Sequence, residues 1–204
     1  YSGSLVLQWP LREATLVAAQ KAADGRLRAL SLGSGEARSC DLPVDDLFPS
    51  DASLDYEAAR KRFADRPADG WAAYAFGVLA VLARERRLPR PKGLRLLIRS
   101  SVPEGKGVSS SAALEVAAMQ AIAALVDLPL EPRELALLAQ TVENRIVGAA
   151  CGVMDQMTAS CGEGSAGRAR RGRRATRRAP SPPWILLRAG PRRLRARTSR
   201  RRRS

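Results

Sequence analysis

The chain has 204 residues, 45% of them hydrophobic, which is enough for one domain with a sizeable core. No apolar run reaches the roughly 20 residues that a membrane-spanning helix needs, so we expect no membrane segment. The formal net charge of +15 is unevenly placed: 16 of the 35 basic residues, all arginine, follow Gly164, whereas all 20 acidic residues precede it. The first 164 residues therefore hold 19 basic and 20 acidic residues, a balance typical of a cytoplasmic enzyme.

The cysteine and histidine content limits the metal sites that the chain can form. The three cysteines, Cys40, Cys151 and Cys161, lack metal-ligand spacing, and the chain has no histidine. We expect reduced thiols in a cytoplasmic protein and no metal site built from cysteine or histidine.

The first elements have strand and then helix patterns. Residues 4–9, 13–20 and 26–32 have the apolar runs or alternation of strands, with Ala-Asp-Gly at 23–25 as a turn signal. We expect a meander at one edge of a sheet. Residues 71–85 have apolar side chains at helical spacing, which predicts a long helix.

The remaining elements alternate in type. Residues 93–102 predict a strand, with Leu94, Leu96 and Ile98 on one face. Residues 109–126 and 131–146 predict helices, and another helix starts within residues 152–160. This order indicates an α+β or α/β layer architecture.

A glycine-containing turn, residues 103–108, joins the strand at 93–102 to the helix that follows. Gly105 and Gly107 permit positive φ and close backbone approach, and the free N–H groups of a helix N-terminus favour an anion. Ser109, Ser110 and Ser111 add hydroxyl groups, one of them a candidate magnesium ligand. From the pattern alone, an ordinary turn with Ser109 as N-cap is the favoured interpretation, because short glycine motifs often occur without function. The run is neither a Walker loop nor a dinucleotide fingerprint.

Two carboxylates, Glu143 and Asp155, lie 12 residues apart with two glycines between them. A turn between two helices could bring both toward one pocket, as a magnesium ligand beside a catalytic group. By spacing alone, an exposed helical glutamate and an aspartate at a helix start are sufficiently explained by their structural roles.

The segment PEGKGVSSSAALEVA closely resembles the second signature of the GHMP kinases, the galactokinase, homoserine, mevalonate and phosphomevalonate kinase family. The resemblance implies ATP as cosubstrate, with the loop around its phosphates. It assigns phosphate contacts to Gly105, Gly107, Ser109 and Ser110, and a magnesium ligand to Ser111. Val108 replaces the usual leucine, which is a minor departure.

The segment VENRIVGAACGVMDQMTASCGE resembles the catalytic segment of galactokinases and, more closely, of arabinokinases. The resemblance implies that Asp155 is the catalytic carboxylate, that Glu143 binds Mg²⁺, and that Gly152 contacts the sugar through its backbone. Ala150 stands where proline is usual, so this turn has less built-in rigidity.

Two further stretches agree with this family. Tyr1 opens a segment that resembles the one after the family's first signature, which places Tyr1 beside the sugar. Trp71 resembles the tryptophan near the adenine in galactokinases, although it fits an ordinary core anchor equally well. Because the chain begins with Tyr1 rather than Met, we expect it to start inside a longer reading frame.

The resemblance covers residues 1–163 and implies the N-terminal, ATP-binding domain of a GHMP kinase. Its expected fold is a mixed sheet with helices on one side, like domain 2 of ribosomal protein S5. The implied activity is Mg²⁺- and ATP-dependent phosphorylation of the anomeric hydroxyl of a monosaccharide of the galactose or L-arabinose type. Because the first and third signatures are absent, we expect the 204-residue chain itself not to be a competent kinase.

Residues 164–204 are rich in arginine and proline, which predicts a disordered tail. We favour a frame-shifted or otherwise aberrant reading of this segment, because the kinase resemblance stops where the family would continue. The alternative is a nucleic-acid-binding protein whose basic arm binds phosphates non-specifically.

Overall fold

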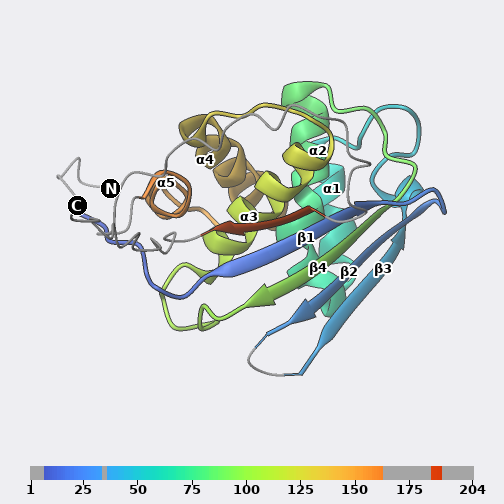
Figure 1. Ribbon diagram of the computed structural model, residues 1–204. Coiled ribbons are helices and arrows are strands. Elements are labelled where there is room, and N and C mark those ends of the chain that lie inside the picture. Colours follow the sequence, from blue (N-terminus) through green and yellow to red (C-terminus); the bar gives the residue numbers. More distant parts are fainter. Residues whose placement is uncertain (1–6, 34–35, 163–184, 190–204) are drawn as a thin grey trace, which may run out of the picture.

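The computed structural model describes residues 7–33, 36–162 and 185–189. They form one sheet whose helices all lie on the same face (Figure 1). This is the predicted α+β architecture, a mixed sheet with helices on one side. In the described ranges no helix is both long and apolar enough to cross a membrane.

The sheet has five strands in the order β3-β2-β4-β1-β5. β2 and β4 pair in parallel, and the other neighbours are antiparallel. The predicted strands are confirmed as β1 (Thr15–Lys21), β2 (Arg26–Leu32) and β4 (Leu94–Ser100), whereas β3 (Arg38–Pro43) had no prediction.

The strand predicted at residues 4–9 is wrong where it can be checked. Residues 7–9 have no regular structure, and residues 4–6 lie outside the described part of the chain. The apolar residues that suggested a strand are largely exposed, with Leu7 92% and Trp9 66% accessible. This segment instead borders a cavity.

The two faces of the sheet follow the alternation of β4. Leu94, Leu96 and Ile98 are buried under the helices, and Arg95, Leu97 and Arg99 between them are exposed. This arrangement confirms the face that the sequence predicted for the core.

The alternation predicts unequal effects of two neighbouring substitutions. Ile98→Val should lower the free energy of unfolding by about 1 kcal/mol, because it removes a buried methylene group. Leu97→Val, on the exposed face, should change it by less than about 0.5 kcal/mol. Denaturant titration of both variants checks the prediction, and equal losses would contradict the facing of β4.

The first part of the helical layer contains three α-helices. α1 (Tyr56–Ala64) begins after Asp55, whose side chain accepts a hydrogen bond from the backbone N–H of Ala58. η2 (Pro67–Ala72) leads into α2 (Ala73–Arg86), and α3 (Ser110–Leu125) follows β4. Because α2 and α3 bury side chains on most of their circumference, they form the centre of the core.

The helical region ends with three consecutive elements. α4 (Pro132–Thr141) continues into η3 (Val142–Val147), which is a π-helix, and α5 (Met154–Cys161) follows. The single helix predicted at residues 131–146 is thus an α-helix with a π-helical last turn. A β-carbon at Gly77 of α2 would lie 3.0 Å from Cγ1 of Val142. Glycine there allows η3, which carries Glu143, to pack closely on α2.

The basic tail contains one described element. β5 (Ile185–Ala189) pairs antiparallel with β1 at the edge of the sheet. The prediction that residues 164–204 lack regular structure is therefore wrong for these five residues, because they include Ile185, Leu186 and Leu187, a short apolar run of the kind that forms strands. The other residues of this segment, and the interpretation of its origin, lie outside what the structure describes.

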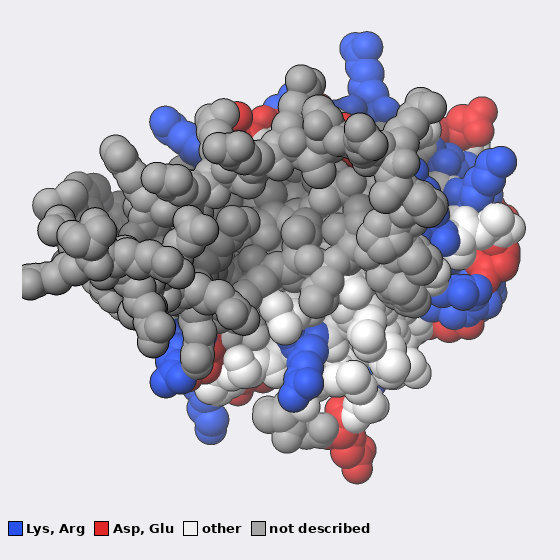
Figure 2. All heavy atoms as spheres, viewed as in Figure 1, with Lys and Arg blue, Asp and Glu red and all other residues white. Residues whose placement is uncertain are grey.

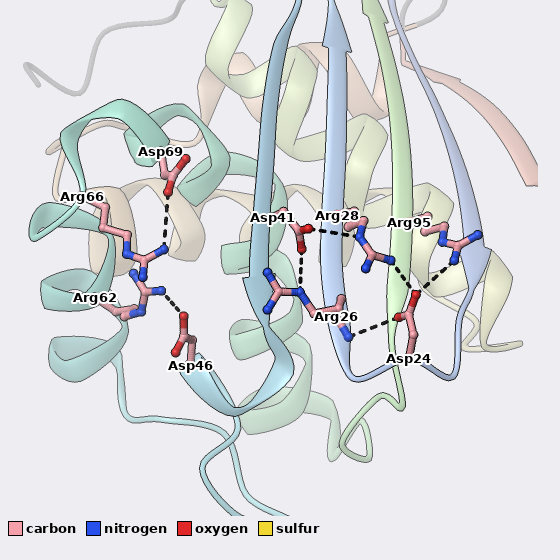
Figure 3. Close-up of polar contacts among 9 residues, drawn as sticks. All are labelled: Asp24, Arg26, Arg28, Asp41, Asp46, Arg62, Arg66, Asp69 and Arg95. Atoms are coloured by element: carbon pink, nitrogen blue, oxygen red, sulfur yellow. Dashed lines mark hydrogen bonds and ion pairs between the residues drawn. The ribbon is translucent and has the colours of Figure 1, made fainter.

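Charged side chains cover the exposed face of the sheet near the β1–β2 turn (Figure 3). Asp41 accepts from Arg26 at 2.8 Å and from Arg28 at 3.2 Å, and Asp24 pairs with Arg28 and Arg95. Hydrogen bonds from Arg28 and then Arg95 lower the pKa of Asp24 to about 2.

This depressed pKa predicts a pH-dependent contribution to stability. The contribution is present above the unfolded-state pKa of about 3.9 and is lost as the pH falls toward 2. Asp24→Asn should therefore be slightly less stable than the parent at pH 6, and most of this difference should be gone at pH 2. Unfolding curves at the two pH values check this, and an undiminished difference at pH 2 would contradict it.

Figure 2 shows basic and acidic side chains interspersed on the visible described surface. This agrees with the near-neutral charge of the first 164 residues. In the part of the chain that can be described, nothing favours the nucleic-acid alternative.

Candidate active site

The predicted phosphate loop lies between β4 and α3 and has an unusual backbone. Gly105, Gly107 and Ser109 all adopt left-handed conformations, with φ of +67°, +68° and +60°. No atom lies within 4 Å of a β-carbon built on either glycine, so the loop faces open space and glycine is required by its backbone conformation.

The serine in this conformation argues for function. A left-handed residue other than glycine costs about 1–2 kcal/mol, and such strain gathers at functional sites. Ser109 makes no side-chain capping hydrogen bond, so the interpretation of Ser109 as an ordinary N-cap is wrong. The amide groups of the first turn of α3 have no partners within the helix, and they suit an anion.

Two cavities flank the loop. One, of about 230 Å³, is lined by Val108, Ser109, Asp155 and Thr158 together with the segment 8–13. The other, of about 220 Å³, is lined by Gly105, Ser110, Ser111, Trp71 and Tyr74 among others. The loop thus separates a cavity that holds Asp155 from a cavity that holds Trp71.

Asp155 lies in the first turn of α5, on the wall of the first cavity. Its Oδ1 accepts a hydrogen bond of 2.9 Å from Nε2 of Gln8. The Oγ1 of Thr158, one turn later on the same helix, donates to Oε1 of Gln8 at 2.6 Å. Sequence reasoning missed Gln8, because its partners are about 150 residues away along the chain.

Glu143 lies in η3 and is only 8% exposed. Its Oε2 accepts a hydrogen bond of 2.6 Å from Nε2 of Gln156, and the thiol of Cys151 lies 3.4 Å from the same oxygen. Burial, and then the charge of Glu143, raise the pKa of Cys151 to about 11, so this thiol stays protonated. The interpretation of Glu143 as an exposed helical glutamate is wrong.

A second buried carboxyl group, Glu115 of α3, shares this environment. Its side chain is fully buried, and its Oε2 accepts from Nε2 of Gln156 at 3.2 Å. Burial, and then the charge of Glu143, raise the pKa of Glu115 to about 9. Glu115 is the single acidic residue within the apolar run 109–126, and this isolated charge was a signal of a buried carboxyl group that sequence reasoning missed.

Trp71 lies in η2, one residue before the end of that turn, rather than inside the predicted helix. The guanidinium of Arg38 sits 5.4 Å from its ring centroid, and Arg38 also pairs with Glu104 of the loop at 2.6 Å. Trp71 therefore lines a cavity and also packs against the core, which confirms its role as a core anchor.

Not all predicted site residues come together in what is described. Gly152 lies half-buried just before α5, and Tyr1 lies outside the described residues. Among the described residues, no group of three acidic, cysteine or histidine side chains could hold a metal ion. Ser111 lies one helical turn before Glu115. Tyr74 lines the same cavity as Ser111, and burial, followed by the charges of Glu143 and Glu115, raises the pKa of Tyr74.

The donor set suits magnesium better than a metal that needs a full protein cage. Mg²⁺ prefers oxygen and often takes only one or two protein carboxylates, with substrate phosphates and water as its other ligands. A serine hydroxyl and a single carboxylate, the groups that the sequence predicted at Ser111 and Glu143, are donors of that kind.

Comparisons with known proteins agree with this arrangement. Residues 73–163 match the family model described as the GHMP kinases N terminal domain. An L-arabinokinase from Arabidopsis thaliana is 48% identical over 187 residues, a match that covers 80% of this chain and 18% of that protein. The chain thus spans less than a fifth of this relative.

Solved structures show the same fold. Galactokinase from Lactococcus lactis, solved with galactose, has a TM-score of 0.54 at 23% identity, covering 73% of this chain and 34% of its own. Mevalonate kinase from Methanococcus jannaschii has a TM-score of 0.55 at 16% identity, covering 79% and 52%. Because of the match to the family model and the 48% identical relative, the chain belongs to the GHMP kinases, and the described domain is their N-terminal domain.

Proposed function

We propose that this protein is part of an ATP-dependent sugar kinase that phosphorylates the anomeric hydroxyl of a monosaccharide of the galactose or L-arabinose type. The observation that carries the proposal is the position of the loop between two cavities. One cavity is lined by Trp71 and the other by Asp155. We assign the first to the adenine and the second to the acceptor sugar. The 48% identity to an L-arabinokinase supports the choice of substrate class.

The chain's own groups would act mainly by positioning and by stabilising charge. Loop amides and the hydroxyls of Ser109 and Ser110 would bind the ATP phosphates. Asp155 would accept a hydrogen bond from the attacking sugar hydroxyl and receive its proton as the sugar oxygen bonds to the γ-phosphorus. The bond from that phosphorus to the bridging oxygen would break, and ADP would leave. When bound, Mg²⁺ held by Ser111 and Glu143 would neutralise phosphate charge. Tyr1 and the backbone of Gly152 are proposed sugar contacts.

Binding of ATP by the loop can be tested on the 204-residue chain. Gly107→Val should abolish measurable Mg-ATP binding in calorimetry, because a branched side chain would force φ negative and fill the space for phosphate. Gly25→Val is a matched control, since Gly25 has the same φ of +68° and an equally open β-carbon position in a remote turn.

The control should lose similar stability and keep ATP binding. Equal ATP affinity in Gly107→Val and in the parent chain would overturn the assignment of the loop. Tail arginines attract phosphates non-specifically, so titrations at two salt concentrations separate that contribution.

Sugar phosphorylation is best measured in a hybrid kinase. In it, residues 7–162 of this chain replace the aligned segment of Arabidopsis thaliana L-arabinokinase, which supplies the rest of the protein. The kinetic predictions below refer to this hybrid kinase.

A further inference from the structure

The segment 7–11 makes a polar contact with the candidate active site, although most of its apolar side chains are exposed. Leu7, Trp9 and Leu11 are exposed, by 92%, 66% and 42% respectively. Gln8 is half-buried, and it reaches across to α5 with both ends of its amide. Pro10 is half-buried and lies next to Gly162, but Leu7, Trp9 and Leu11 bury too little apolar surface to hold the segment on the core. The two hydrogen bonds of Gln8 to α5 therefore call for another explanation.

The geometry around Gln8 fixes which end of the amide faces Asp155. Thr158 donates its hydroxyl proton to Oε1 of Gln8 at 2.6 Å, while the carbonyl of Met154 competes for it at 3.0 Å. The Oε1 end of the amide is therefore engaged by a donor, and the Nε2 end is left to donate to Oδ1 of Asp155 at 2.9 Å. Asp155 and Thr158 lie three residues apart on α5, so Gln8 spans one helical face.

In this arrangement the two oxygens of the Asp155 carboxylate can have different partners. An ionised carboxylate has two oxygens with about four acceptor positions. Oδ1 is engaged by Gln8, which leaves Oδ2 for a group in the cavity. An amide does not titrate, so Gln8 itself takes no proton from a substrate.

Resting on the proposed function, we propose that Gln8 is a positioning residue: with Thr158, it fixes the rotamer of Asp155 so that Oδ2 faces the sugar hydroxyl. Loss of this contact would let the carboxylate rotate. Small misplacements of a reacting group cost up to about 10²-fold in rate. Gln8 would thus affect the rate of transfer more than the binding of either substrate.

The contact itself can be tested on the 204-residue chain by NMR of glutamine side-chain amides labelled with ¹⁵N. Gln8→Leu assigns the Gln8 resonances by their loss. Asp155→Asn and Thr158→Val should each shift these resonances and make the side-chain amide protons of Gln8 exchange faster with water. The resonances of Gln20 on β1 should stay unchanged. Gln8 resonances that do not respond to either substitution would overturn the inference.

The role in catalysis is tested in the hybrid kinase. Gln8→Leu and Thr158→Val should each lower kcat about 10- to 100-fold, with KM for ATP and sugar within about twofold. Thr158→Ser, which keeps the hydroxyl, should restore most of the rate. Gln20→Leu is the control for the loss of a glutamine side chain, and its kcat should equal that of the parent.

The outcomes separate the two proposals. Unchanged kcat in both Gln8→Leu and Thr158→Val, with a strong loss in Asp155→Asn, would overturn the positioning role and leave the proposed function in place. An active hybrid kinase in which Asp155→Asn also has no effect would overturn the assignment of Asp155, and the role of Gln8 with it.

Discussion

Asp155→Asn is expected to lower kcat of the hybrid kinase by about 10²- to 10⁴-fold, the usual contribution of a general base. The substitution keeps the size of the side chain and removes the charge and basicity next to the acceptor hydroxyl. KM for ATP should stay within about twofold, because the loop that would bind the phosphates is untouched. Initial rates of sugar phosphate formation over a range of both substrates provide the measurement.

A remote aspartate serves as the control. Asp127, at the far end of α3, also becomes asparagine without a change of size, and it keeps its left-handed φ of +55°, which asparagine tolerates. Asp127→Asn should leave kcat unchanged. Turnover of Asp155→Asn within threefold of the parent would remove Asp155 from the mechanism.

Glu143→Gln is expected to raise the Mg²⁺ concentration for half-maximal rate by at least about tenfold. Even residues that only support a metal ligand typically change metal affinity by 10- to 100-fold, so loss of a direct carboxylate ligand should reach that range. Ser111→Ala should act in the same direction. Glu134→Gln, at a half-buried glutamate of α4 that pairs with Arg86, is the control for loss of a carboxylate elsewhere.

Titration of activity with Mg²⁺ at saturating ATP and sugar measures this effect, with rates plotted against the concentration of free Mg²⁺. An identical titration for parent and Glu143→Gln would rule out Glu143 as a metal ligand. A change in Glu143→Gln without one in Ser111→Ala would restrict the assignment to the carboxylate.

The core of the fold could be predicted from the sequence because its elements have strong periodicity. β4 alternates regularly, and α2 and α3 are long apolar helices. α1 had no prediction, since only Ala59 and Phe63 of its nine residues are buried and four of the nine are charged. β3 was missed because its alternation is short, with only Cys40 and Leu42 of its six residues buried.

The site could be predicted in part. The loop and the two carboxylates are local motifs, and a resemblance to known sequences assigned them roles. Gln8 and Glu115 were missed because their environments depend on contacts between distant segments. The burial of Glu143 was missed for the same reason, because it depends on the close packing of the π-helix η3 on Gly77 of α2.

The most direct test of the central claim follows phosphate transfer in the hybrid kinase, with ATP labelled at the γ-phosphate and either galactose or L-arabinose. Our account predicts Mg²⁺-dependent formation of the labelled sugar 1-phosphate from at least one of these sugars, in equal amounts with ADP, and its loss in Asp155→Asn. A folded hybrid kinase that binds ATP but transfers no label to either sugar would contradict the account.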